Sequence, residues 1–254
     1  MGVINNADNI MLGDNEVDRV YKNSVIVWER SHPYTYRLLN YLQTTGSEGI
    51  ITDIIPKYTN AIEMNLKFID YSPIDTTMYL CGLTKRDTNN AVDSHYSFCI
   101  TRASGVTNHV ARFMFGQTAW ETGNCIFNVG ISQTPFTIRG YFGGVCSYGN
   151  YTKTVNSPPI SLNQPSSGLG FGGTALYVES TQSYTFRPVY EGGDCTMQLF
   201  EFKVYAENGY TVVINDLKPA ERSDGMLGFL DVITDKFYTN AGAGGFISGG
   251  YVTD

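Results

Sequence analysis

The stretch GMLGFLDVITDKFYTNAGAGGFISG, residues 225–249, decides which class of fold this chain can adopt. Its glycines allow two interpretations: a loop that cradles phosphate, or the last hairpin of a β-structure with glycines where the chain bends. A P-loop needs a lysine followed by Ser or Thr, and the segment NAGAGGF at 240–246 has neither. Turn glycines explain the stretch better, so we expect it to close a β-sheet structure.

The composition of the 254-residue chain favours many short strands joined by tight turns. Hydrophobic residues make up 42%, which is ample for a packed core, while charged residues make up 16%, and glycine (27) and tyrosine (18) are abundant. The formal net charge is −7 and no block of Lys or Arg appears, which disfavours nucleic acid as a partner. The N-terminus lacks the pattern of a secretory signal, and no apolar run is long enough to predict membrane insertion.

Alternation of apolar and polar residues recurs along most of the chain. The segment AIEMNLKF at 61–68 is the clearest, because its apolar residues fall at every second position. The segment LFEFKVY at 199–205 shows a similar pattern, which predicts Phe200 and Phe202 on one face of a strand. No window keeps a helical period over three turns. The sequence therefore predicts an all-β fold of antiparallel strands, buried on one or both faces.

Residues 1–30 stand apart from the rest of the chain. Their alternating pattern turns at KNS, residues 22–24, into a second apolar run, which is typical of a β-hairpin. Residues 31–35 are predicted to be a linker, because Pro33 fixes an extended bend, and residues 36–254 follow as one large domain. A hairpin alone is marginally stable, so this one must pack on its own domain, on a second copy or on a partner. We expect attachment or oligomerisation through Val17, Val20, Tyr21, Val25, Val27 and Trp28.

The cysteines of the chain are odd in number, widely spaced and never arranged as a CxxC pair. This usage predicts free, mostly buried thiols in a chain made in a reducing compartment. If the protein works outside a cell, it must leave by a route other than secretion. The cysteines are Cys81, Cys99, Cys125, Cys146 and Cys195.

The segment GLGFGG at 168–173 matches the dinucleotide-binding pattern G-x-G-x-x-G letter for letter. A dinucleotide site needs a strand before these glycines and a helix after them, so that the helix N-terminus meets the pyrophosphate. Here SLNQPSS precedes the glycines and the strand-like TALYVES follows them. The context fails, so we expect turn glycines and no cofactor.

Patterns that would carry catalysis or bind a metal are weak. Retaining glycosidases hold two carboxyl groups close together, and no strand carries the alternating acids E-x-D-x-E that this would need. The nearest match, Asp14, Glu16 and Asp18, is interpreted as a solvated acidic edge, with a calcium site as the alternative. No G-x-S-x-G appears, and the three histidines share no metal-ligand spacing. We therefore predict neither an enzyme nor a metal centre.

Aromatic residues within two polar loops are the remaining candidates for a binding site. Sugars stack their apolar C–H faces on aromatic rings while amides and carboxylates bond the hydroxyl groups. The alternative is structural: the two tyrosines form a cross-strand pair beside a turn, and the tryptophan covers an edge of the core. The candidate glycan contacts are Trp120, Glu121, Asn124, Tyr148, Asn150 and Tyr151.

The C-terminal sequence resembles a known family. Residues 199–246 resemble the end of concanavalin A-like (laminin-G/lectin/glucanase) domains found in phage structural proteins and gut bacteria, and LLNYLQTTGSEGIITDIIP at 38–56 resembles their opening segment. Departures from the family pattern lie at Gly49, Ile51 and Asp53. The C-terminal matches are Phe202, Tyr205, Gly209, Asp216, Pro219, Gly225, Gly228, Asp231, Phe237, Tyr238, Asn240, Gly242 and Phe246.

This resemblance covers residues 36–250 and implies a jelly-roll sandwich of two antiparallel sheets. The segment LGDNEVDRVYKNSVIVWE at 12–29 also resembles a short element that precedes such domains in phage virion proteins, with Asn23 where that pattern prefers Gly. Phage origin would explain how a protein folded in a host cytoplasm with reduced thiols reaches the outside, because lysis releases it.

The resemblance implies a non-enzymatic virion protein of a bacterial virus, such as a fibre, tail or capsid decoration protein. Residues 1–30 would attach it to other virion proteins or to sister subunits. The sandwich would lie on the virion surface and contact host-surface polysaccharide, and many weak sites favour a homo-oligomer such as a trimer. Three alternatives stay open: a purely architectural virion protein, a glucanase-type glycoside hydrolase, and a bacterial glycan-binding protein without a virion.

Overall fold

The computed structural model divides the chain into two compact units, Met1–Thr35 and Tyr36–Asp254, and each is described by itself. Its described residues are 10–12, 15–17, 19–22, 25–29, 34–57, 59–71, 76–86, 89, 92–102, 109–116, 125–129, 133–141, 145–154, 168–178, 180–188, 195–207 and 209–253.

The N-terminal unit contains two antiparallel strand pairs. Strand β1 (Ile10–Leu12) pairs with β2 (Asn15–Val17), and β3 (Arg19–Lys22) pairs with β4 (Val25–Glu29). The β3–β4 pair lies where the sequence predicts the hairpin, with Val20 opposite Trp28 in the backbone register. Val17 belongs to β2 and thus to the other pair, so the candidate attachment residues are divided between two small sheets.

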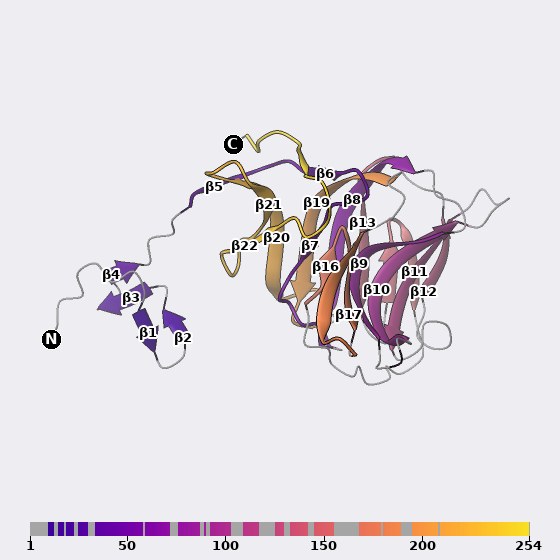
Figure 1. Cartoon of the computed structure of the whole chain (residues 1–254), viewed down its shortest axis with the longest axis horizontal. Coiled ribbons are helices and arrows are strands. Elements are labelled where there is room, and N and C mark those ends of the chain that lie inside the picture. The colour runs from indigo at the N-terminus through magenta and orange to yellow at the C-terminus, as the bar shows by residue number, and fades with distance from the viewer. Residues whose placement is uncertain are drawn as a thin grey trace. The chain divides into compact units, whose positions relative to one another are not determined.

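The described part of the larger unit consists of two β-sheets and no helix, which confirms the predicted all-β class (Figure 1). All strand pairs are antiparallel except β17 with β9, which is parallel. The 8-stranded sheet has the order β12-β11-β10-β9-β16-β7, with β17 beside β9 and β18 beside β17. Its strands are β7 (Ile50–Ile51), β9 (Thr76–Arg86), β10 (Val92–Arg102), β11 (His109–Gly116), β12 (Cys125–Val129), β16 (Gly170–Phe171), β17 (Gly173–Val178) and β18 (Ser183–Pro188).

The 11-stranded sheet has the order β15-β14-β13-β8-β19-β20-β21-β22, and β5, β6 and β23 pair alongside this path. Its strands are β5 (Tyr36–Leu38), β6 (Leu42–Thr44), β8 (Ala61–Tyr71), β13 (Phe136–Tyr141), β14 (Val145–Tyr148), β15 (Tyr151–Thr154), β19 (Cys195–Tyr205), β20 (Val213–Arg222), β21 (Leu227–Asp231), β22 (Lys236–Thr239) and β23 (Ile247–Ser248).

The core lies between the two sheets, so the unit is a β-sandwich. Phe171 on β16 packs against Phe202 on β19 and Phe229 on β21, with ring centroids 4.9 Å apart in both pairs. Alternation fixes which face of each strand enters this core, because successive side chains point to opposite sides of a sheet. On β8 the predicted apolar face is buried, which confirms the prediction for Ile62, Met64, Leu66 and Phe68.

One predicted face on β19 is wrong. Leu199 and Phe202 are buried in the core, whereas Phe200 is half-buried and its ring lies against Tyr41 (centroids 5.8 Å). The cause is a shift in the pairing of β19 with β8 between Leu199 and Glu201, because an extra residue in one strand reverses the alternation that follows it.

The two glycine-rich segments are points of close backbone contact. A Cβ at Gly168 would lie 1.8 Å from the carbonyl oxygen of Thr52, and one at Gly242 would lie 1.9 Å from that of Ser47. The strand β17 follows the GLGFGG segment where a dinucleotide site would need a helix. In the C-terminal stretch, β20, β21 and β22 pair in sequence as two hairpins, so the interpretation of residues 225–249 as turns between strands is confirmed.

Four cysteines are buried and form no disulfide, as the sequence predicts. The side chain of Cys125 lies outside the described part of the chain. Burial raises the pKa of Cys81 and of Cys195 to about 12, which keeps both thiols protonated and chemically inert. The four are Cys81, Cys99, Cys146 and Cys195.

Candidate functional site

The β14–β15 hairpin carries three of the six residues that the sequence predicts as sugar contacts. Its two strands are joined by Gly149 and Asn150, and the N–H of Gly149 donates a hydrogen bond to the carbonyl oxygen of Thr137 on β13 (2.8 Å). Tyr148 and Tyr151 stand opposite each other in the backbone register. The other three predicted contacts, Trp120, Glu121 and Asn124, lie outside the described residues.

A pocket of about 500 Å³ lies beside this hairpin turn, and we call it the Tyr151 pocket. Its walls are residues 148–151 of the hairpin and residues 134–137, which lead into β13. The volume falls in the range of small-molecule sites, about 300–1,000 Å³. The three predicted contacts on this hairpin therefore share one concave surface.

Tyr148 and Tyr151 differ in their surroundings. The ring of Tyr148 is 3% exposed and packs against Phe136 (centroids 4.7 Å) and Phe98 (6.2 Å), so it belongs to the core. Tyr151 is 59% exposed at the start of the edge strand β15, every residue of which is exposed. Only Tyr151 offers a ring face on which a ligand could stack.

The hydroxyl group of Tyr148 has unused hydrogen-bonding capacity. Its Oη atom is buried, and no hydrogen bond from any described residue reaches it. Burial raises the pKa of Tyr148, so the phenol keeps its proton and remains a donor. A buried hydroxyl without a partner costs about 1–3 kcal/mol, so a hydrogen bond to this atom would be favourable.

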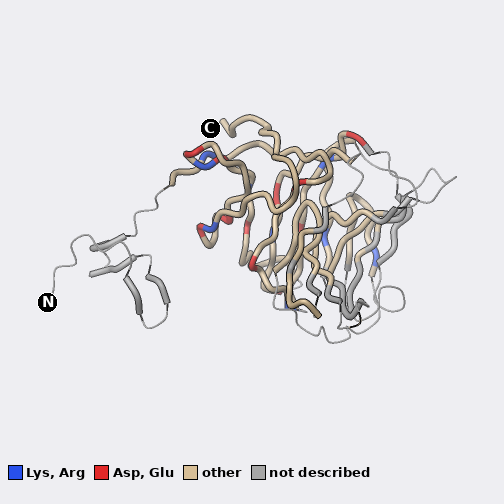
Figure 2. Tube along the Cα trace, in the orientation of Figure 1, with Lys and Arg blue, Asp and Glu red and all other residues tan. Residues whose placement is uncertain are grey.

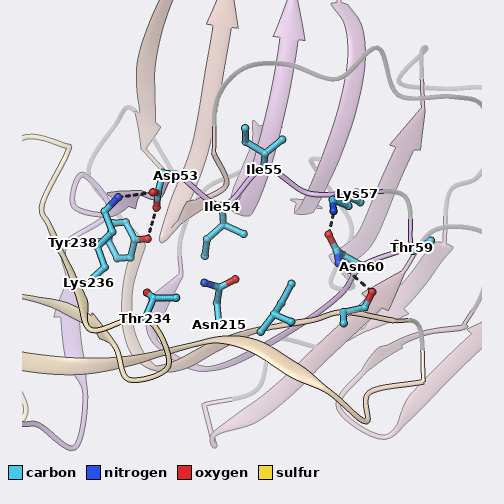
Figure 3. A pocket seen from close by; sticks show the side chains of 12 residues that line it. Asp53, Ile54, Ile55, Lys57, Thr59, Asn60, Asn215, Thr234, Lys236 and Tyr238 are labelled. Atoms are coloured by element: carbon cyan, nitrogen blue, oxygen red, sulfur yellow. Dashed lines mark hydrogen bonds and ion pairs between the residues drawn. The ribbon is translucent and has the colours of Figure 1, made fainter. Parts of the chain in front are cut away.

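A second pocket, of about 520 Å³, lies where the segment 53–60 crosses the ends of β20 and β22; we call it the Asp53 pocket (Figure 3). Ile54 and Asn215 face each other across its middle in this view, and Asp53 and Tyr238 stand together at one end. The lining residues are Asp53, Ile54, Ile55, Lys57, Thr59, Asn60, Ala206, Ile214, Asn215, Thr234, Lys236 and Tyr238.

Asp53 is held at one end of this pocket by two donors from β22. Its carboxylate forms an ion pair with Lys236 and accepts a hydrogen bond from the hydroxyl group of Tyr238. Burial alone would raise the pKa of Asp53, but the hydrogen bonds from Lys236 and Tyr238 outweigh it and lower the pKa below its ordinary value. Asp53 is therefore an ionised acceptor whose position is fixed.

Asp231, behind the opposite wall, orients two of the lining side chains. This buried carboxylate accepts hydrogen bonds from Nδ2 of Asn215 (2.7 Å) and from Oγ1 of Thr234 (2.7 Å). It also accepts the N–H groups of Asp216 (2.9 Å) and Ile233 (3.1 Å). Burial would raise the pKa of Asp231, but these bonds, led by the one from Asn215, lower it below its ordinary value.

Asn60 fixes the third wall of the Asp53 pocket. Its Oδ1 accepts the N–H of Lys57 (2.7 Å), and its Nδ2 donates to the carbonyl oxygens of Tyr205 (3.0 Å) and Ala206 (3.3 Å) at the end of β19. One side chain thus closes the loop at residues 57–60 and attaches it to the sheet. The wall is preformed by bonds within the protein.

Sequence reasoning did not find the Asp53 pocket. In the sequence, Asp53 is distinguished only by its departure from a family pattern. No local motif connects the segment 53–60 with the β20 strand or with the β21–β22 turn. The usable indication was Asp231, which matches that pattern and begins the β21–β22 turn. Carboxylates in this position commonly bond the backbone of the turn that follows.

Carboxylates also gather on the outer face of the 11-stranded sheet, from three different strands. The register places Lys203 on β19 between Glu63 on β8 and Asp216 on β20. Glu63 pairs with Arg139, while Glu201 pairs with Lys203 (2.9 Å) and also with Lys218. Lys218 lies 3.2 Å from Asp216 as well, and Figure 2 shows basic and acidic positions close together in this unit.

Asp216 is an outer-face carboxyl group whose pKa is raised above its ordinary value. Burial raises its pKa, the charge of Lys203 opposes this, and the nearby carboxylates of Asp231 and Glu63 raise it further. Each of the outer-face carboxylates nevertheless has a cationic partner. The arrangement is that of a charge network on a sheet surface, not of a free acid beside a free base.

A scan against protein-family models finds no match for this chain, and a search of curated proteins finds no relative. The resemblance to concanavalin A-like domains therefore stays a prediction. Among the described residues, no helix has the length and apolar character needed to cross a membrane, and no group of three or more His, Cys, Asp or Glu residues could hold a metal ion.

Proposed function

We propose that this chain is a non-enzymatic virion protein of a bacterial virus whose sandwich, a concanavalin A-like jelly roll, binds host-surface glycan at the Tyr151 pocket. Residues 1–30 attach it to other virion proteins or to sister copies, with the sandwich on the virion surface. The observation that carries the binding role is the exposed ring of Tyr151 at a pocket that Tyr148 also lines, Tyr148 being a residue whose buried Oη has no hydrogen-bond partner among the described residues.

A sugar has the surface chemistry that this pocket complements. One face of a sugar ring carries C–H groups that stack on an aromatic ring, while its hydroxyl groups both donate and accept hydrogen bonds. Tyr151 supplies the ring, and Asn150, Thr134 and Thr137 supply polar groups at the wall. A sugar hydroxyl that reached Tyr148 Oη would form the hydrogen bond that this buried group lacks. Such a bond would add more to the binding free energy than a bond to a group that already has a partner.

The glucanase alternative is less well supported by the outer-face carboxylates. A retaining glycosidase needs one carboxyl group that is protonated and a second that is free to attack. Glu63, Glu201 and Asp216 come from three strands, and each is engaged by Arg139, Lys203 or Lys218. Ion pairing occupies oxygens of Glu63 and Glu201 that a nucleophile would use, while Asp216, whose pKa burial raises, is the one of the three that resembles a general acid.

The direct test is binding of the full-length chain to surface polysaccharides extracted from a panel of bacteria. Tyr151→Ala removes the exposed ring and is expected to weaken binding about tenfold, because an aromatic stacking contact contributes about 0.5–1.5 kcal/mol. Tyr34→Ala is the matched control, because it removes another exposed ring (37% exposed) that does not line the pocket.

Tyr148→Phe separates a binding role from a packing role. The substitution keeps the buried ring and removes only the unpartnered Oη, so the sandwich should keep or gain stability, by about 1 kcal/mol. Glycan binding should nevertheless weaken. Saturable binding that neither Tyr148→Phe nor Tyr151→Ala affects would move the site elsewhere, and no binding by any folded variant would favour the architectural alternative.

A further inference from the structure

We propose that the Asp53 pocket is a second saccharide site, one that takes an uncharged sugar unit by accepting hydrogen bonds from its hydroxyl groups. The inference goes beyond the proposed function, which concerns the Tyr151 pocket at the other end of the same sheet. It rests on the cavity, on the direction of the hydrogen bonds in its walls, and on the balance of its charges.

The volume and lining of the Asp53 pocket suit a ligand with one apolar and one polar side. At about 520 Å³ it is as large as many small-molecule sites. Ile54, Ile55 and Ile214 form its apolar part, and Ile55 (44% exposed) and Ile214 (36% exposed) still have surface to cover. A ligand that placed C–H groups against these side chains would remove apolar surface from water.

Around Asn215 and Thr234 the polar wall presents hydrogen-bond acceptors, while Lys57, Lys236 and Thr59 elsewhere in the lining can donate. Asn215 donates one of its amide N–H groups to Asp231, and Thr234 donates its only hydroxyl proton to the same carboxylate. The amide oxygen of Asn215 and the lone pairs of the Thr234 hydroxyl remain for a ligand. Figure 3 shows the amide of Asn215 directed into the pocket below Ile54.

Asp53 adds acceptors at the end of the pocket. Tyr238 bonds one carboxylate oxygen and Lys236 the other, but each oxygen of a carboxylate can accept more than one hydrogen bond. The two donors come from β22 and hold the carboxylate in place. Bonding a sugar hydroxyl would therefore require little further ordering of the site.

The charges of the pocket favour an uncharged ligand. Two cations line it, Lys57 and Lys236, and two carboxylates balance them: Asp53 at the end and Asp231, which bonds two of the lining side chains. Counted with Asp231, which is buried and does not line the pocket, the two positive and two negative groups balance and leave little net charge to attract an acidic sugar. Hydroxyl groups, which donate to acceptors without carrying charge, fit this wall best.

The test observes binding at this pocket directly by NMR. The full-length chain is labelled at the isoleucine δ1-methyl groups, and the signals of Ile54, Ile55 and Ile214 are identified with Ile→Val variants. The probes are the methyl glycosides of glucose, galactose and mannose, N-acetylglucosamine, and glucuronate as the acidic counterpart. We expect at least one uncharged sugar to shift these signals in a saturable way and glucuronate to bind about tenfold or more weakly.

Two variants make the result specific. Asp53→Ala removes an exposed acceptor and should weaken the uncharged sugar about tenfold, since hydrogen bonds to charged groups are among the stronger ones. Asp224→Ala is the matched control, because Asp224 is also an exposed carboxylate paired with a single basic residue, Arg222, but does not line the pocket.

The outcomes that would overturn this inference are distinct from those that bear on the Tyr151 pocket. Shifts caused by glucuronate but by no uncharged sugar would indicate an anion site. If no sugar at tens of millimolar shifts the signals of the three isoleucines, the Asp53 pocket is not a saccharide site. If glycan binding depends on Tyr151 while these methyl signals stay unchanged, the proposed function is supported and the second saccharide site is refuted.

Discussion

Removal of the Asp231 carboxylate should destabilise the sandwich by an amount that can be worked out from its four hydrogen bonds. Two donors, Ile233 and Thr234, lie in the exposed β21–β22 turn and can bond water instead, so they contribute little. The other two, Nδ2 of Asn215 and the N–H of Asp216, are half-buried. At about 1.5 kcal/mol for each bond to a charged acceptor, Asp231→Ala should cost about 3 kcal/mol.

The pH dependence provides an independent check on the same group. The pKa of Asp231 is lowered in the folded protein, so its carboxylate stabilises the fold above the unfolded value of 3.8, and this contribution is lost as the pH falls through the lower folded value. Wild-type protein should therefore lose stability below about pH 4. Asp231→Asn, which cannot ionise, should lose less over that interval.

Urea denaturation of the full-length chain, followed by tryptophan fluorescence and circular dichroism, measures both quantities. Asp224→Ala is the control, because the ion pair of that exposed carboxylate with Arg222 should contribute little to stability. A loss below about 1 kcal/mol for Asp231→Ala at neutral pH would refute the reasoning. So would equal acid sensitivity in wild type and Asp231→Asn.

Two further predictions concern the thiols and the N-terminal unit. Cys81 and Cys195, whose pKa values burial raises to about 12, should resist alkylation in native protein at about pH 8 and react after unfolding, as peptide mass spectrometry would show; labelling of either in native protein would contradict this. If the proposed function holds, deletion of residues 1–30 should leave a folded sandwich that no longer enters virus particles, and incorporation of the truncated chain at wild-type stoichiometry would refute the proposed attachment role.

The parts of the fold that the sequence predicts are those specified by local patterns. Strand β8 is predictable over residues 61–68 because every second residue is apolar, and the extra residue on the β8 side of its pairing with β19 comes only after Phe68. The position of Phe200 is not, because the shift in pairing on β19 arises from its alignment with β8, and a single residue of offset moves a side chain to the other face.

The same distinction explains which pocket the sequence could reveal. Residues 148–151 are contiguous, so two tyrosines around a Gly149–Asn150 turn suggest a site from the local sequence alone. The Asp53 pocket brings together residues from 53–60, 206–215 and 234–238, which become neighbours through the pairing of β20, β21 and β22 and through the bonds of Asp53 and Asn60 to those strands and to the end of β19. Asp231 can be recognised along the chain as a carboxylate before a turn, but nothing local connects it with the acceptors of the pocket.

The position of the two pockets bears on how such a protein would hold a glycan. The Tyr151 pocket adjoins β14 and the Asp53 pocket adjoins β20, which is four strands further along the same sheet. At about 4.8 Å per strand the two lie roughly 20 Å apart across the sheet, so one sugar unit cannot occupy both. If both proposals hold, each copy of the sandwich would bind either two distant units of one polysaccharide or two separate polysaccharide chains. Attachment would then gain strength from several weak contacts within one copy, before any oligomer multiplies them.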